Sequence, residues 1–472
     1  MMINNAYLLP RYVSDSQVKT DSNGTPDWAS SAIFAEVNIA TATPDGTLDA
    51  AVKVLDHYAE MGVNALWICP VYDNGGGGGS YGNYGPHSID SALTGTEDYA
   101  QGWQKMKAFV DEAHKRNIRI ILDIIMWGTN KNSPLVTEHP DWYNGKEDWG
   151  GFTFDWNNNE LRSWFIERAV DVVNNTGCDG LRYDLEPSIT GYELAKEIRS
   201  RLNEQGKKPF MMSEQQNERQ GAYDVSEIGI VGLQEIVDSF YKTEPEYFFI
   251  DEYDMVDTIK NGKQIGGGFW EEKNLGCAFR YYMGTVACHD NRYTVVRGNR
   301  LAIGYQSIFS PFIPMWYIGE EWNNPQTVED VLYYNQIDWS AMDIPENRAF
   351  FEDVKKMIRI RRQYPEIFTY YPEHFRDTNI CRVETDAAEG PKAYARYADG
   401  KAMLIIPNVK TAETEITVTV PFDGAGLDDR LYTVLDAETD EVIASDISRD
   451  NAAIRIKVPQ VDQRVLLVKP AE

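Results

Sequence analysis

The chain has 472 residues, of which 43% are hydrophobic and 25% charged, so it can bury a large core and is neither disordered nor fibrous. Its formal net charge of -28 disfavours nucleic acid and anionic membranes as partners, because phosphate binding needs clustered Lys and Arg. No stretch approaches the roughly 20 apolar residues of a membrane span, and the N-terminus lacks a signal-peptide pattern. We expect a cytoplasmic protein without nucleic-acid or membrane partners.

The cysteines are odd in number, scattered, and show no paired metal-ligand spacing. Each has apolar or glycine neighbours, which is typical of a buried core thiol in a reducing compartment. We therefore expect free thiols without a catalytic role at Cys69, Cys178, Cys277, Cys288 and Cys381.

Short apolar runs alternate with helical patterns over the first three quarters of the chain. The run at 32–39 is strand-like, a helix with a glycine C-cap is predicted over 47–62, and 63–72 contains a buried strand that a proline stops. An amphipathic helix over 96–117 with basic residues in its last turn leads into the apolar strand 118–127. This alternation is typical of repeated βα units around a parallel sheet.

Later apolar runs each end in polar or charged residues, at 180–184, 209–214, 281–290 and 311–321. In a (β/α)8 barrel the active site collects at the C-terminal ends of the strands, so these charged ends are candidates for chemistry. The segment 225–275 shows no clear strand pattern, which leaves the position of the sixth strand open.

The pattern changes near residue 372. Alternating runs at 415–422, 430–436 and 452–470 are separated by Asp, Gly and Asn turns, with little helical periodicity. The predicted fold class is α/β: a (β/α)8 TIM barrel over 1–371, with a short insertion at about 127–158, followed by a small all-β sandwich domain over 372–472.

Four segments resemble, in order, conserved regions of the α-amylase family of glycoside hydrolases (family 13): GLRYD (180–184), SEQ (213–215), ACHDN (287–291) and FIPMWYIGEEWN (312–323). The resemblance covers nearly the whole chain, with the β domain as the family's C-terminal domain. It implies that Asp184 is a catalytic nucleophile, Glu214 the acid/base and Asp290 a third carboxylate that stabilises the transition state.

The chemistry of glycoside cleavage gives an independent reason for such a set. Retention of configuration needs a carboxylate on one side of the anomeric carbon and a protonated carboxyl on the other, roughly 5 Å apart. Asp184 and Glu214 would supply this pair. The negative charge of Asp290 would help the acid to keep its proton.

Other residues are predicted to bind substrate or support the carboxylates. Arg182 lies two residues before Asp184, so on an extended strand both side chains project to the same side, and the cation keeps the nucleophile ionised. His289 would hydrogen-bond sugar hydroxyls, and Asp123 would pair with Arg182.

Aromatic residues are predicted to stack on the apolar faces of sugars. Tyr84 best resembles the family tyrosine beneath the scissile sugar, and Tyr81 is the alternative. Trp127 and Trp156 are further candidates.

The chain departs from the family in two motifs. Trp127 and Gly128 stand where the family has an Asn-His pair after Asp123, and LEPS (185–188) lacks the usual Lys-His. Because that Asn is usually a calcium ligand, we expect no cofactor and no metal site, with calcium as an open alternative. The losses also favour a short or branched substrate, or an unusual linkage, over ordinary starch endo-hydrolysis.

The favoured function is a retaining glycoside hydrolase that cleaves α-glucosidic bonds in malto-oligosaccharides or related short α-glucosides through a covalent intermediate. One alternative is a transglycosylase or isomerase of the same family, which shares that intermediate. The other is a non-catalytic carbohydrate-binding protein, which three retained carboxylates disfavour. Linkage, oligomeric state, metal content and the choice between hydrolysis and transfer stay open.

Overall fold

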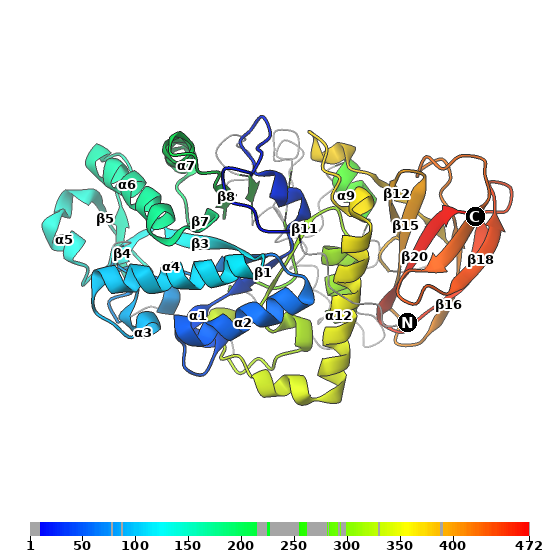
Figure 1. Cartoon of the computed structure of the whole chain (residues 1–472), viewed down its shortest axis with the longest axis horizontal. Coiled ribbons are helices and arrows are strands. Elements are labelled where there is room, and N and C mark those ends of the chain that lie inside the picture. The colour runs from blue at the N-terminus through cyan, green and yellow to red at the C-terminus, as the bar shows by residue number, and fades with distance from the viewer. Residues whose placement is uncertain are drawn as a thin grey trace.

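A computed structural model provides the structure of the chain (Figure 1). It describes residues 10–76, 79–85, 88–214, 224–226, 254–261, 281, 283–290, 293, 299–328, 331–387 and 390–471. Cys277, Gln215, Asn291 and most of 225–275 therefore lie outside the described residues.

Eight parallel strands form one sheet, in the order β10-β11-β1-β2-β3-β7-β8-β9. Their order along the chain follows their order around the sheet, as in the predicted (β/α)8 barrel, which is thereby confirmed. The sixth strand is β9, a two-residue strand that pairs with the end of β8 and is too short to leave a pattern in the sequence. The strands are β1 (Phe34–Val37), β2 (Ala65–Ile68), β3 (Arg119–Ile125), β7 (Gly180–Asp184), β8 (Phe210–Ser213), β9 (Val225–Ser226), β10 (Met283–Thr285) and β11 (Ile313–Tyr317).

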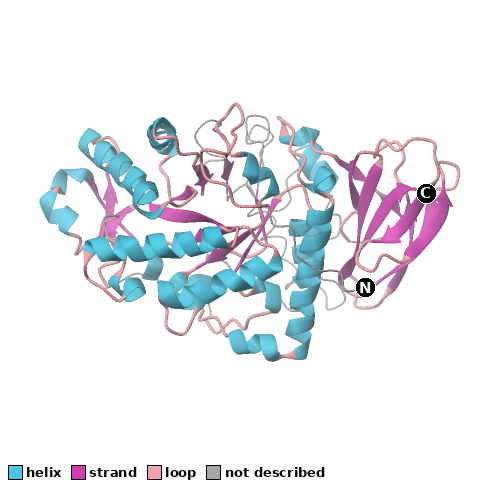
Figure 2. Ribbon diagram, viewed as in Figure 1, coloured by secondary structure: helices cyan, strands magenta, loops and turns pink. Residues whose placement is uncertain are grey.

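Long amphipathic helices cover the outside of this sheet (Figure 2). The helix predicted over 47–62 is confirmed: Thr47 caps α2 by accepting from the Ala50 N–H, and Gly62 ends it in the left-handed region at φ 91°. Within the described ranges, no helix is both long and apolar enough to cross a membrane. The helices are α1 (Ile39–Ala42), α2 (Leu48–Met61), α3 (Ser91–Thr94), α4 (Tyr99–Lys115), α5 (Pro134–Glu138), α6 (Asn159–Thr176), α7 (Ser188–Glu204), α9 (Met255–Asn261), α11 (Asn299–Leu301), α12 (Pro345–Gln363) and α13 (Pro365–Phe368).

A small antiparallel sheet leaves the barrel between β3 and α6. It consists of β4 (Gly128–Asn130), β6 (Gly151–Phe154) and β5 (Tyr143–Asp148), in that order. Its own cluster of buried residues anchors it to α6, and the turn between β5 and β6 carries Trp149. This sheet occupies the segment predicted as an insertion at about 127–158.

The C-terminal part is all antiparallel. A six-stranded sheet has the order β12-β14-β15-β20-β17-β18, and a three-stranded sheet the order β13-β16-β19. Leu404 and Leu466 of the larger sheet share one buried cluster with Ile416 and Ile456 of the smaller, so the two sheets pack face to face as a sandwich. The strands are β12 (Ile380–Arg382), β13 (Glu384–Thr385), β14 (Tyr394–Ala398), β15 (Lys401–Asn408), β16 (Thr414–Thr419), β17 (Tyr432–Asp436), β18 (Val442–Ile447), β19 (Ala453–Val458) and β20 (Asp462–Pro470).

The junction between the two parts is packed. α12 stands between the barrel and the C-terminal sheets (Figure 1). Ile380, Tyr394 and Leu467 of the sandwich belong to the same buried cluster as the barrel core. The boundary at 371/372 remains a prediction.

Candidate active site

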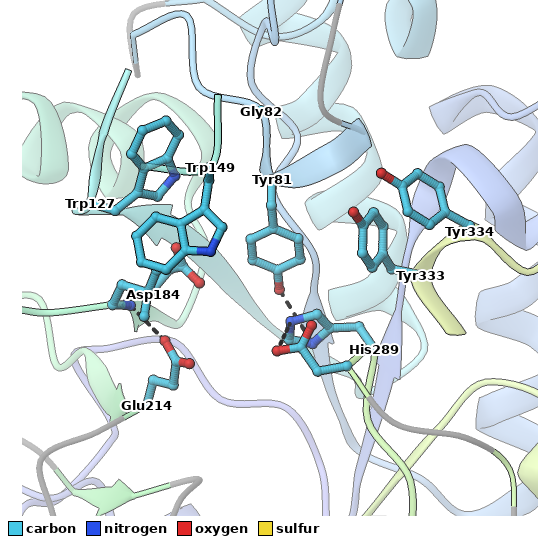
Figure 3. A pocket seen from close by; sticks show the side chains of 11 residues that line it. Tyr81, Gly82, Trp127, Trp149, Asp184, Glu214, His289, Tyr333 and Tyr334 are labelled. Atoms are coloured by element: carbon cyan, nitrogen blue, oxygen red, sulfur yellow. Dashed lines mark hydrogen bonds and ion pairs between the residues drawn. The ribbon is translucent and has the colours of Figure 1, made fainter. Parts of the chain in front are cut away.

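A cavity of about 390 Å³ opens beside the ends of β3, β7, β8 and β10 (Figure 3). The three predicted carboxylates, which come from three different strand ends, all line it. Two tryptophans form one side, two tyrosines form the other, and Tyr81 lies between them. The lining residues are Tyr81, Gly82, Trp127, Trp149, Asp184, Leu185, Glu214, His289, Asp290, Tyr333 and Tyr334.

Arg182 is the fully buried cation behind the carboxylates. Its Nη1 donates to Asp184 Oδ1 at 2.7 Å and to Asp123 Oδ2 at 3.1 Å, and its Nη2 lies 3.5 Å from Glu214 Oε2. The predicted pairings of Arg182 with Asp184 and Asp123 are therefore present. One guanidinium thus bridges the side chains predicted as nucleophile and acid/base.

Asp184 ends β7 and is buried. Its pKa is raised to about 8, chiefly by burial and also by the charges of Glu214 and Asp123, while Arg182 opposes these effects. Arg182 therefore provides the main support for the ionised form that a nucleophile requires.

Glu214 follows β8, and its Oε2 accepts the backbone N–H of Leu185 at 2.6 Å. Leu185 has φ 47°, in the left-handed region, which costs a leucine about 1–2 kcal/mol. This conformation comes directly after Asp184 and aims the N–H at Glu214. The strained residue thus fixes the acid/base candidate relative to the nucleophile candidate.

His289 and Asp290 follow β10. His289 is buried, whereas the Asp290 side chain is 60% exposed, and His289 Nε2 lies 3.4 Å from Asp290 Oδ2. Burial alone would lower the pKa of His289, but the charges of Glu36 and Asp290 raise it to about 10. Glu36, the penultimate residue of β1, was missed by the sequence analysis, although a glutamate within an apolar run was a usable signal.

Of the two tyrosines considered for the sugar platform, Tyr81 lines the cavity. The Tyr81 hydroxyl donates to Asp123 Oδ2 at 2.8 Å, and its ring stacks on His289 with centroids 4.5 Å apart. Tyr84 is not among the lining residues, and its ring packs so closely on Gly75 that a Cβ there would lie 2.6 Å from it. The role of Tyr84 beneath a sugar stays a prediction, and the alternative, Tyr81, is the one of the two that lines the described cavity.

Trp127 lines the cavity as predicted and meets Trp149 edge to face, with centroids 5.9 Å apart. Trp156 does not line it, and its Nε1 instead donates to the Met126 carbonyl. The sequence analysis missed Trp149, which is 62% exposed at a hairpin tip. A tryptophan in a polar turn was the available signal.

Tyr333 and Tyr334 were also missed. They belong to the 3-10 turn Leu332–Tyr334, and their rings lie 3.9 Å apart. Tyr333 is held at its backbone, where its N–H donates to the His289 carbonyl and its carbonyl accepts from Asn38 Nδ2. Two adjacent tyrosines in a loop gave no indication of this position.

Glu36, Cys288 and His289 place potential metal-ligating atoms within 4.8 Å of one another. However, His289 Nδ1 lies only 2.6 Å from Glu36 Oε1. Two atoms bound to one tetrahedral zinc at about 2.0 Å each would lie roughly 3.3 Å apart. The geometry of this trio fits a direct hydrogen bond better than a shared ion.

Residues 8–177 match the family model "Alpha amylase, catalytic domain". The chain is 29% identical to a malto-oligosyltrehalose trehalohydrolase of Arthrobacter ramosus over 184 residues. This match covers 37% of this chain and 30% of that protein. It is 30% identical to a 1,4-alpha-glucan branching enzyme of Corynebacterium glutamicum over 162 residues. That match covers 32% of this chain and 21% of the branching enzyme. The matches thus span less than a third of either relative.

The fold is similar to that of a crystallised alpha-amylase of Anoxybacillus, with a TM-score of 0.72 and 17% identity over 94% of this chain and 99% of that one. That likeness concerns the fold alone. Together with the match over residues 8–177, it supports the resemblance of this chain to the α-amylase family of glycoside hydrolases.

Proposed function

We propose that this chain is a retaining glycoside hydrolase that cleaves α-glucosidic bonds in malto-oligosaccharides or related short α-glucosides. The observation that carries the proposal is the meeting of Asp184, Glu214 and Asp290 in one cavity with aromatic side walls. The carboxylates suit acid/base and nucleophilic chemistry on an acetal, and the aromatic rings suit the apolar faces of sugars.

In the proposed mechanism, Asp184 attacks the anomeric carbon while Glu214 protonates the leaving glycosidic oxygen. This forms a glycosyl ester on Asp184 and releases the first product. Glu214 then removes a proton from a water molecule, which attacks the same carbon and frees Asp184. Asp290 supplies negative charge near the oxocarbenium-like transition state.

The neighbourhood of the cavity supports a substrate longer than a disaccharide. A second cavity of about 360 Å³ shares Tyr333 and Tyr334 with the first. Its described lining contains Asn38, Thr41 and Ser80 together with Asp45 and Asp90, but no Lys, Arg or His, so it suits hydroxyl-rich groups better than anions. A glucan chain lying across the tyrosine pair would reach both cavities.

Tyr334→Ala tests this arrangement. Because loss of one aromatic contact costs about 0.5–1.5 kcal/mol, we expect kcat/KM on maltoheptaose to fall roughly threefold to tenfold. Activity on maltose should change little. Tyr370→Ala removes an equally exposed tyrosine outside the cavities and serves as the control. Equal losses on both substrates would contradict the proposed path.

A related transglycosylase is the second candidate. The relatives include a branching enzyme as well as a trehalohydrolase, and both reactions proceed through the same covalent intermediate. The two functions differ in whether water or a sugar hydroxyl intercepts that intermediate. The proposed substrate in both cases is an oligosaccharide, and the proposal invokes no cofactor.

Product analysis on α-1,4, α-1,6 and α-1,1 glucosides decides among these functions. The wild type should release sugars whose anomeric configuration, followed by proton NMR, is initially retained. Glu214→Gln should slow cleavage about 10²-fold to 10⁴-fold. New oligosaccharides without net hydrolysis would favour the transglycosylase, and inverted products or unimpaired Glu214→Gln would refute the mechanism.

A further inference from the structure

Glu36 is a fourth carboxylate at this centre, but it lies behind the cavity wall. It is the penultimate residue of β1, its side chain is fully buried, and it is not among the lining residues. Both of its oxygens face His289: Oε2 accepts the backbone N–H at 3.0 Å, and Oε1 lies 2.6 Å from ring Nδ1. The first strand therefore holds the segment that follows β10, with β11 between them in the sheet.

The imidazole of His289 is enclosed by other rings. Tyr81 stacks on it, and Trp67 meets it edge to face with centroids 5.4 Å apart. With Nδ1 bonded to Glu36, Nε2 is the nitrogen that faces Asp290 on the side of the cavity. The orientation of the ring is thus set before substrate arrives.

We propose that Glu36 is a positioning residue that keeps His289 doubly protonated, with its Nε2–H directed at Asp290 and at a substrate hydroxyl. This proposal rests on the proposed function, because His289 would act on the glycosyl group bound in the cavity. A neutral imidazole has one donor and one acceptor nitrogen, whereas the imidazolium donates from both. Glu36 thereby fixes the donor role of Nε2.

The charges around His289 come from several elements. Glu36 on β1 and the adjacent Asp290 favour the cation, whereas Arg182 on β7 opposes it. Tyr81 places its hydroxyl 3.4 Å from Nδ1 and links the ring to Asp123 on β3. Cys69, which follows β2, donates to Glu36 Oε1 and remains a neutral thiol because burial raises its pKa.

Removal of the Glu36 charge should therefore let His289 titrate in the neutral range. In Glu36→Gln, the amide nitrogen would replace one carboxylate oxygen. A hydrogen-bond donor would then face either the backbone N–H or the ring Nδ1 of His289, where the wild type has an acceptor. Two-dimensional NMR of the imidazole nitrogens should show His289 protonated up to about pH 9 in the wild type and losing its proton at least two pH units lower in Glu36→Gln. His289→Gln assigns the signal among the six histidines.

The pH–rate profile provides the second readout. We expect Glu36→Gln to lose roughly tenfold to a hundredfold in kcat at pH 8 and to recover most of that loss at pH 5.5, where the imidazole regains its proton. Glu36→Asp retains the charge, so it should lower kcat without introducing the alkaline loss. A merely structural defect would lower the rate at every pH.

Glu321→Gln is the matched control. Glu321 is equally buried, contacts His57 Nε2 at 3.0 Å and accepts the Gly319 N–H at 2.9 Å, but neither Glu321 nor His57 lines the cavity. The pH–rate profile of Glu321→Gln should keep the wild-type shape. An unchanged His289 titration in Glu36→Gln would overturn the proposal even if Glu214→Gln is inactive. Absence of glucan turnover by the wild type would instead refute the proposed function, and the NMR titration would still test Glu36.

Discussion

Replacement of Asp184 by Asn should abolish turnover while making the folded protein less sensitive to alkali. We expect kcat to fall at least about a thousandfold, because in the proposed mechanism this side chain forms the glycosyl ester and an amide cannot replace it. Since the pKa of Asp184 is raised to about 8 from its ordinary value, the folded state binds its proton more tightly than the unfolded state. The contribution of this group to wild-type stability therefore falls as pH rises from about 4 to about 8, and this contribution is absent from the variant.

The measurement is the free energy of unfolding of both proteins by chemical denaturation across that pH range. Asp179→Asn is the control, because the pKa of Asp179 is shifted in the opposite direction to that of Asp184. Asp179 is also buried, yet His114 and Arg119 hold its pKa below the ordinary value despite burial, so its carboxylate adds stability above about pH 4. If Asp184→Asn loses stability as pH rises relative to wild type, the ionised Asp184 carboxylate does not destabilise the folded state.

Replacement of Arg182 by Met should have the largest effect on stability. The substitution leaves the carboxylates of Asp123, Asp184 and Glu214 close together without their shared cation. Breaking a buried ion pair costs about 3–5 kcal/mol. Without the cation, which lowers the pKa of Asp184 in the folded state, that pKa rises further, so the destabilisation should be greatest at pH 8 and should shrink at pH 5.

Arg396→Met separates this electrostatic effect from loss of packing. Arg396 is also fully buried, but its described bonds go to the carbonyls of Ser310 and Ile367 and to Asn379. Burial lowers its pKa to about 10, so it stays charged between pH 5 and 8. Its loss should destabilise the protein by a similar amount at both pH values. The same flat dependence in Arg182→Met would contradict the proposed role of the cation.

The site could be predicted from sequence where a residue's place along a strand decided its location. Asp184 and Arg182 are two residues apart on an extended strand, so they project to one side. The carboxyl ends of parallel barrel strands meet at one rim, so the motifs that contain Asp184 and Glu214 were expected to lie together. Tyr333 and Glu36 were not predicted, and Tyr81 was only the alternative, because their contacts join segments far apart in the chain. Glu36 and His289, for example, are 253 positions apart.

Local patterning was sufficient for the alternation of strands and helices and for the antiparallel C-terminal part, since hydrophobic period and turn residues are properties of neighbouring positions. The ordered set of strand-end carboxylates came from the resemblance to family motifs. Tertiary structure alone decided the position of the two-residue β9, which of two tyrosines faces the cavity, and which buried acid holds His289. These features depend on how loops pack across the barrel and on which charges meet after folding. Such contacts leave no periodic trace in the sequence.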